Sequence, residues 1–154
     1  MEGIGMLKKL IKVYLDQQKL MQIATVKDGK PWVCSVWQVS DQDLNIYYFS
    51  SITRRHSIEI ESNPNISGAL CYPSTPEEAP RGLSFEGTVE RLVSTGDIAV
   101  ARSLYEGRIF PPEKVDEFMA HKERAHSFYK ITPTSYVLFD VESYPDNPRQ
   151  QLDL

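Results

Sequence analysis

The chain has little of what marks several classes of protein. Its 154 residues include only two cysteines, Cys34 and Cys71, which lack CxxC spacing and lie in strand-like runs, so we expect buried free thiols in a reducing compartment. The three histidines show no ligand spacing, and no metal site is predicted. No apolar run approaches the length of a membrane span, and residues 1–9 lack the continuous apolar core of a signal peptide. These absences favour a cytoplasmic protein that does not bind membranes.

An excess of positive charge is also absent. The formal net charge of −4 argues against a nucleic-acid partner, so that any basic cluster is a local feature. A hydrophobic content of 41% with 25% charged residues is ordinary for a globular protein, and the length suits one domain. Since we find neither repeats nor a second domain, the sequence predicts a single domain over residues 1–154.

Hydrophobic periodicity predicts a β-rich chain with a few short helices. Apolar residues recur at helical spacing from Leu7 to Leu15, which predicts an amphipathic helix over residues 4–17. Further helices are predicted over 57–62, over 95–106 with Thr95 as its cap, and from Pro112 to Met119. Strands are predicted over 20–26, 32–40, 44–49, 65–72, 83–93, 127–131 and 135–142.

Glycine and proline mark where these elements turn. Asp28-Gly29 predicts a hairpin with a loop of about five residues, and Gly87 predicts a bulge or bend in its strand. Residues 73–80 form a proline-rich acidic loop, either a lid over a ligand or a mobile connection. The tail over 143–154 is expected to be frayed or to lie over a partner subunit. Because the strands follow in hairpin-like order without βαβ alternation, we predict a mainly β fold, a small antiparallel barrel with peripheral helices.

The most informative stretch runs from Tyr48 to His56. A β-rich run ends in hydroxyl residues and is followed by Arg54, Arg55 and His56 at the start of the short helix. Cations are disfavoured at a helix N-terminus, whereas anions bind there. A bound phosphate would therefore account for the three basic residues. The alternative is a solvated basic turn whose arginines pair with Glu59 or Glu61, and the residues alone leave both open.

The order of the motifs resembles the FMN-binding split β-barrel superfamily, of which pyridoxamine 5′-phosphate oxidase is the best-known member. The resemblance covers roughly Leu20 to Asp140 and implies an antiparallel split barrel of six or more strands in Greek-key-like order. A small bacterial branch resembles the chain most in Arg81-Gly82-Leu83 and Arg108-Ile109-Phe110-Pro111. The remaining motifs are Ala24-Thr25-Val26, Asp28-Gly29-Lys30-Pro31, Tyr47-Tyr48-Phe49-Ser50, Thr53-Arg54-Arg55-His56, Asn63-Pro64 and Phe85-Glu86-Gly87-Thr88-Val89.

This resemblance implies where a flavin would bind. The phosphate would lie at the end of the third strand and the start of the next helix, and the ring edge would lie along the second strand. A homodimer is implied, with the flavin in the groove between subunits, so that Arg81 or the tail completes a neighbour's site. The phosphate residues would be Ser50, Ser51, Thr53, Arg55 and His56, and the ring residues Cys34, Ser35, Val36 and Trp37.

The chain also departs from the oxidase. His56 stands where a lysine is usual, Cys34 where an arginine is usual, and no basic segment near the C-terminus matches the one that binds the substrate phosphate. We therefore expect an FMN-dependent oxidoreductase that acts on a small-molecule substrate or electron donor, and these departures argue against pyridoxine phosphate as that substrate. The alternatives are a flavin-binding or stress-related protein without turnover, or a barrel that binds deazaflavin or haem. Without the resemblance, Cys34, Val36 and Trp37 suit a core equally well, and Trp32 and Trp37 suit a dimer interface.

Overall fold

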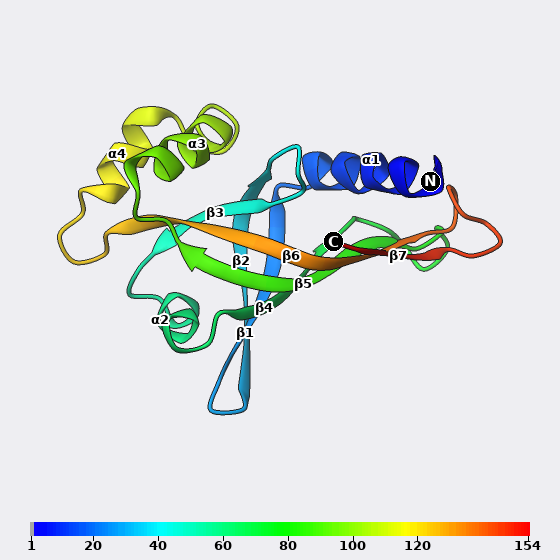
Figure 1. Ribbon diagram of the computed structural model, residues 1–154, viewed down its shortest axis with the longest axis horizontal. Helices are drawn as coiled ribbons and strands as arrows, with labels where there is room; N and C mark the ends of the chain where they lie inside the picture. The colour runs from blue at the N-terminus through cyan, green and yellow to red at the C-terminus, as the bar shows by residue number, and fades with distance from the viewer. Residues whose placement is uncertain (1) are drawn as a thin grey trace.

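Seven strands form one antiparallel sheet in the computed structural model, which describes residues 2–154 (Figure 1). Their order is β3-β2-β1-β4-β5-β6-β7, and β3 also pairs with β6, which closes the first six strands into a ring. This arrangement confirms the mainly β, barrel-like fold that the sequence predicts. The strands are β1 (Leu20–Lys27), β2 (Lys30–Ser40), β3 (Ile46–Ser51), β4 (Asn65–Cys71), β5 (Arg81–Arg91), β6 (His126–Asp140) and β7 (Arg149–Asp153).

The β1–β2 hairpin is tighter than predicted. Lys27 pairs directly with Lys30, so only Asp28 and Gly29 form the loop, and the expected five-residue loop is wrong. Both residues have positive φ, 52° and 70°. Two consecutive left-handed residues match the right-handed twist of the flanking strands, which is why Asp-Gly permits the shorter turn.

A bulge interrupts the pairing of β5 with β6 beside Gly87, where the sequence predicts a bulge or bend, and its extra residue, Thr134, lies on β6. The register shifts between Glu86 and Gly87, and Gly87 lies opposite Pro133. The two separate strands predicted on either side of Pro133 are one strand, β6, and that prediction is wrong. Pro133 lies between the stretch of β6 that pairs with β3, which ends at Ile131, and the stretch that pairs with β7, which begins at Ser135. The missing proline N–H therefore interrupts neither of these two ladders.

The C-terminal tail is part of the sheet. Residues 149–153 form β7, which pairs with residues 135–139 of β6 and buries the side chain of Leu152. The expectation of a frayed tail is therefore wrong. Beyond its pairing with β3, the edge of β6 has free backbone N–H and C=O groups, and the tail pairs with them. The composition of the tail alone does not indicate this pairing.

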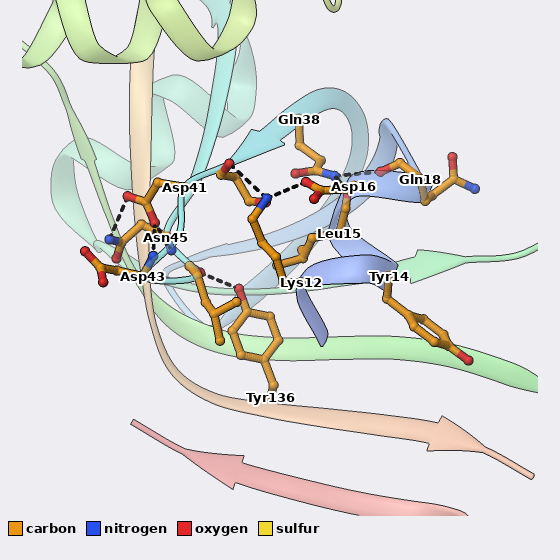
Figure 2. Close-up of polar contacts among 12 residues, drawn as sticks. Lys12, Tyr14, Leu15, Asp16, Gln18, Gln38, Asp41, Asp43, Asn45 and Tyr136 are labelled. Atoms are coloured by element: carbon orange, nitrogen blue, oxygen red, sulfur yellow. Dashed lines mark hydrogen bonds and ion pairs between the residues drawn. The ribbon is translucent and has the colours of Figure 1, made fainter. Parts of the chain in front are cut away.

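Within residues 2–154, four helices lie outside the ring: α1 (Glu2–Gln17), α2 (Arg55–Ser62), α3 (Thr95–Tyr105) and α4 (Pro112–Met119). Helix α1 buries Leu7, Ile11 and Leu15, and the amide nitrogen of Gln38 on β2 donates to the Leu15 and Gln18 carbonyls at 2.7 and 2.6 Å (Figure 2). These bonds satisfy carbonyls that a helix C-terminus leaves unpaired. No helix between residues 2 and 154 has both the length and the apolar content needed to cross a membrane.

The turn between β2 and β3 is held by one carboxylate. Asp41 accepts from the backbone N–H of Asp43 and of Asn45, at 3.0 and 2.9 Å (Figure 2). Leu44 adopts a left-handed φ of 67°, and its carbonyl accepts a 2.6 Å bond from Tyr136. The strand consequently begins at Ile46, two residues later than the apolar run suggests.

Strand β3 is buried on both faces and separates two apolar cores. Ile46 and Tyr48 belong to the barrel interior, whereas Tyr47 and Phe49 face α3 and α4. Helix α3 is capped by Ser94, which accepts from the Asp97 N–H at 3.1 Å, and not by Thr95 as predicted. The second core is completed by Val39, Leu92, Ala101, Tyr105, Val115 and Phe128.

Gly87→Ala tests the bulge. A Cβ at Gly87 would lie 2.3 Å from the Thr132 carbonyl oxygen and 2.7 Å from the Pro133 Cα, both backbone atoms. We expect the free energy of unfolding to fall by about 1–3 kcal/mol, measured by urea denaturation. Gly96→Ala is the control, because nothing lies within 4 Å of its added Cβ. Equal stability of the two variants would contradict the close approach.

Candidate functional site

The site predicted at residues 50–56 lies where β3 ends and α2 begins. The Thr53 and Ser51 hydroxyls are 3.0 Å apart, and the Arg54 N–H donates to the Ser51 carbonyl. Helix α2 begins at Arg55, two residues before the predicted start, and its N-cap residue Arg54 makes no side-chain capping bond. No acidic residue lies in the first turn. The free N–H groups and positive dipole end of α2 are thus accompanied by added positive charge, a combination that suits an anion.

Arg55 is held by two contacts of its side chain. Its Nε donates to Glu59 at 2.7 Å, and its guanidinium carbon lies 4.3 Å from the ring centroid of Trp32 on β2. The other carboxylate oxygen of Glu59 accepts from the Thr25 hydroxyl of β1 at 2.6 Å. Hydrogen bonds from Thr25 and Arg55 hold the pKa of Glu59 below its ordinary value, so the carboxylate is ionised at neutral pH. The Arg–Glu pair that the sequence left as an alternative is therefore present.

His56 is turned into the barrel. Its side chain is buried, with Nδ1 3.2 Å from the Cys34 Sγ and Nε2 2.8 Å from the Ser50 Oγ. Burial lowers the pKa of His56 below 6.5, and the charge of Arg54 lowers it further, against a smaller raising effect of Glu59. A neutral imidazole has one donor and one acceptor nitrogen, and both face protein groups here. His56 therefore joins β2, the end of β3 and α2.

Cys34 is a thiol rather than a thiolate. Burial, and then the charge of Glu59, raises the pKa of Cys34 to about 11. A thiol with a raised pKa is a poor nucleophile at neutral pH. Cys34 is half-buried and Cys71 is exposed, so the expectation of two buried thiols is wrong for Cys71. The exposure of Cys71 follows from its place at the end of β4, on the outer face of the sheet.

The second strand presents its predicted ring residues on two faces. Cys34 and Val36 face inward, whereas Ser35 and Trp37 face outward, with Trp37 46% exposed. Beside Ser35, the Gln22 amide nitrogen donates to the Ser35 hydroxyl at 3.5 Å. The Gln22 Oε1 is buried without a hydrogen-bond partner among residues 2–154. The structure thus joins Cys34, Ser50 and His56 directly, keeps Ser51 and Thr53 beside them, and leaves Ser35 and Trp37 on the outer surface.

Two hollows in the surface contain none of the nine predicted site residues. A groove of about 420 Å³ runs along β1, β4 and β5, and it includes Thr25, the hydroxyl partner of Glu59. The 73–80 loop lines a second cavity of about 290 Å³ together with Arg81 and Asp140. This cavity also contains none of the predicted site residues. Neither hollow is the phosphate site that the sequence indicates.

Thr25 is a site residue that sequence reasoning missed, and the roles of Trp32 and Glu59 were only partly foreseen. The spacing of four residues between Arg55 and Glu59 signals their pair in a helix. No local signal links Thr25 or Trp32 to α2, because their contacts arise only once the β1–β2 hairpin lies beside that helix (Figure 1).

The titration of His56 gives a stability test. Since the folded protein lowers the pKa of His56, the unfolded chain binds this proton more readily, and stability is lost as pH falls from about 6.5 through the lowered value. We expect His56→Gln to make the free energy of unfolding less dependent on pH in this window. Denaturant titrations from pH 7.5 to pH 5 measure it, and an unchanged slope would contradict the buried neutral imidazole.

Comparison with known proteins places this fold. Residues 7–136 match the pyridoxamine 5′-phosphate oxidase family, and no curated protein matches the chain. General stress protein 26 from Bacillus anthracis is similar in structure, with a TM-score of 0.68 and 17% identity over 96% of this chain and 98% of that one. The haem storage protein HutZ from Vibrio cholerae has a TM-score of 0.67 and 21% identity over 81% and 88%. A haem-binding protein from Mycobacterium smegmatis reaches 0.75 with 15% identity over 95% of this chain and 57% of its own. With the family match spanning most of the barrel, the chain belongs to the pyridoxamine 5′-phosphate oxidase family.

Proposed function

We propose that this protein binds FMN through the start of α2 and the outer side of β2, and acts as a flavin-dependent oxidoreductase. The observation that carries the proposal is the uncapped, acid-free first turn of α2 with Arg54 and Arg55 at its start. A phosphate dianion would neutralise both the arginines and the positive end of the helix.

The residues present fit the phosphate end of the cofactor. The hydroxyls of Ser51 and Thr53 lie 3.0 Å apart in the turn just before α2, and the Arg55 side chain is 48% exposed, so that it is accessible to an anion. His56 has a different role, because its two ring nitrogens already contact Cys34 and Ser50. We therefore assign the phosphate to Ser51, Thr53 and Arg55, and assign His56 and Ser50 to holding the turn against the barrel.

The strand side of the site fits the ring end. The pyrimidine edge of an oxidised flavin carries one N–H donor between two carbonyl acceptors, and the unpartnered Gln22 Oε1 beside Ser35 is an acceptor that this donor would satisfy. Trp37 offers an exposed aromatic surface on the same face of β2.

A bound flavin would supply the transfer of hydride or electrons, and the protein would supply binding and orientation. The titratable groups nearest the predicted ring strand, Cys34 and His56, are both uncharged near neutral pH. Because the pKa of Cys34 is raised and that of His56 is lowered, neither is a ready proton donor or a charged group near neutral pH. This composition suits a site that binds and orients the cofactor.

Arg55→Ala tests the phosphate assignment. Loss of a charge-assisted hydrogen bond of about 1.5–3 kcal/mol should weaken FMN about tenfold to a hundredfold. Riboflavin, which has no phosphate, should bind the variant and the parent equally, as followed by quenching of flavin fluorescence. Arg108→Ala, an exposed arginine on the connection between α3 and α4, is the control. If Arg55→Ala binds FMN as the parent does, the phosphate lies elsewhere.

Two measurements separate the alternatives. Steady-state reduction of the bound flavin by a nicotinamide nucleotide distinguishes an oxidoreductase from a flavin-binding protein without turnover. The visible spectrum of the purified protein distinguishes FMN from deazaflavin and from haem, which the structurally similar proteins from V. cholerae and M. smegmatis store or bind.

We also propose a homodimer formed through the outer face of β1 and β2. Leu20 pairs with Trp37 and Ala24 with Val33, so these side chains form one stripe, on which Val33 is 59% exposed. Val33→Glu should shift sedimentation from dimer toward monomer at micromolar concentration, because it places a charge in the apolar stripe. Val100→Glu, at a 51% exposed valine on α3, is the matched control. A monomeric parent with FMN bound would refute the dimer.

A further inference from the structure

Arg55 is held on two sides by groups that leave one edge of its guanidinium open. Trp32 covers one flat face, and Glu59 accepts the Nε–H. Arginine has five N–H donors, four of them on the two Nη atoms. Among residues 2–154, the only hydrogen bond of the Arg55 side chain is the one from Nε. The Nη edge is the one that binds phosphate or carboxylate through two parallel hydrogen bonds.

The Arg55–Glu59 pair does little for the helix itself. An i,i+4 pair stabilises a helix best when the acid precedes the base, and this pair has the reverse order. Arg55 also lies in the first turn, where the helix dipole opposes its charge. Helix stability therefore does not explain the pair, whereas the fixed position that it gives to the Arg55 guanidinium does.

Glu59 is fixed from the other side by the barrel. Its side chain is 6% exposed, and its second carboxylate oxygen accepts from Thr25, which is itself buried on β1. Both oxygens are thus bonded, one to the barrel wall and one to Arg55. The side chains of Thr25 and Glu59 form a rigid connection from β1 to the guanidinium.

We propose that Thr25, Glu59 and Trp32 are positioning residues that hold the Arg55 guanidinium with its Nη edge presented to an anionic group of the ligand, an inference that rests on the proposed binding of FMN phosphate by Arg55. A fixed guanidinium loses less conformational freedom on binding than a mobile one, so affinity rises although none of the three touches the phosphate.

The competing explanation assigns Glu59 the opposite effect. If Glu59 only neutralises Arg55, its removal strengthens anion binding, because a negative charge near the phosphate disappears. If Glu59 positions Arg55, its removal weakens binding. Thr25→Val separates the effects further, because it removes the hydroxyl that holds Glu59 and leaves every charge in place.

The experiment compares FMN and riboflavin affinities of the purified full chain by quenching of flavin fluorescence. We expect Thr25→Val and Glu59→Gln each to weaken FMN about threefold to tenfold, with riboflavin unchanged. Thr25→Ser, which keeps the hydroxyl, should restore parental affinity. In an Arg55→Ala background, Thr25→Val should have no further effect on FMN, because the group that it positions is gone.

A matched control is available for each of the two substitutions. Glu61→Gln removes the same charge from the exposed side of α2, and Thr132→Val removes a hydroxyl from an exposed strand position. Neither should change FMN affinity. Trp32→Leu provides a second route if Thr25→Val lowers stability too far, and it should weaken FMN and not riboflavin. Tighter FMN binding by Glu59→Gln, equal losses for both flavins, or additive losses with Arg55→Ala would overturn the proposal.

A second readout separates this inference from the proposed function. In ¹⁵N-detected NMR of the ligand-free protein, the Arg55 Nε–H should give a distinct, rigid signal that Thr25→Val and Glu59→Gln broaden or shift toward free arginine. If the parent binds no FMN, the proposed function fails, and the NMR signal still decides whether the guanidinium is held. A mobile Arg55 Nε–H in the parent would refute the positioning.

Discussion

The pairing of β3 with β6 is the constraint on which the rest of the structure depends. Six successive pairs from Ile46↔Ile131 to Ser51↔His126 close the sheet into a ring. This closure removes two open edges that would otherwise require other partners. It also fixes the end of β3, and therefore the direction in which the chain enters α2. The candidate site lies at this point, so its geometry follows from barrel closure rather than from the local turn.

Closure also explains why β3 is buried on both faces. A strand with a barrel on one side and helices on the other has no solvated face, so its tyrosines and phenylalanine do not follow a simple polar alternation. Tyr48 stacks on Tyr129 inside the ring, with ring centroids 4.9 Å apart, whereas Phe49 stacks on Phe128 at 4.5 Å on the side of the helices. Helices α3 and α4 thus cover the outside of the strands that lead into the site (Figure 1).

Around the start of α2, charged groups are arranged according to their access to water. The imidazole of His56 and the thiol of Cys34 are buried and uncharged near neutral pH, while the buried carboxylate of Glu59 stays ionised because two donors satisfy it. The positive charges of Arg54 and Arg55 remain at the surface. An anion approaching the start of α2 would therefore meet positive charge first, with the buried acid Glu59 already engaged by Thr25 and Arg55.

The sequence by itself determined the elements and the chemistry available at the site. Alternating apolar residues, Asp28-Gly29, Gly87 and Pro112 act on their immediate neighbours, so the strands, the bulge and the start of α4 were predictable, as was the basic turn at residues 53–56. Only the tertiary structure decided that β6 is continuous through Pro133, that the tail adds β7, and that His56 turns inward toward Cys34. The contact of Thr25 with Glu59 belongs to the same group. Each of these joins residues distant in the chain, and such contacts form only when the closed barrel brings β1, β2, β3 and β6 to α2 and the tail.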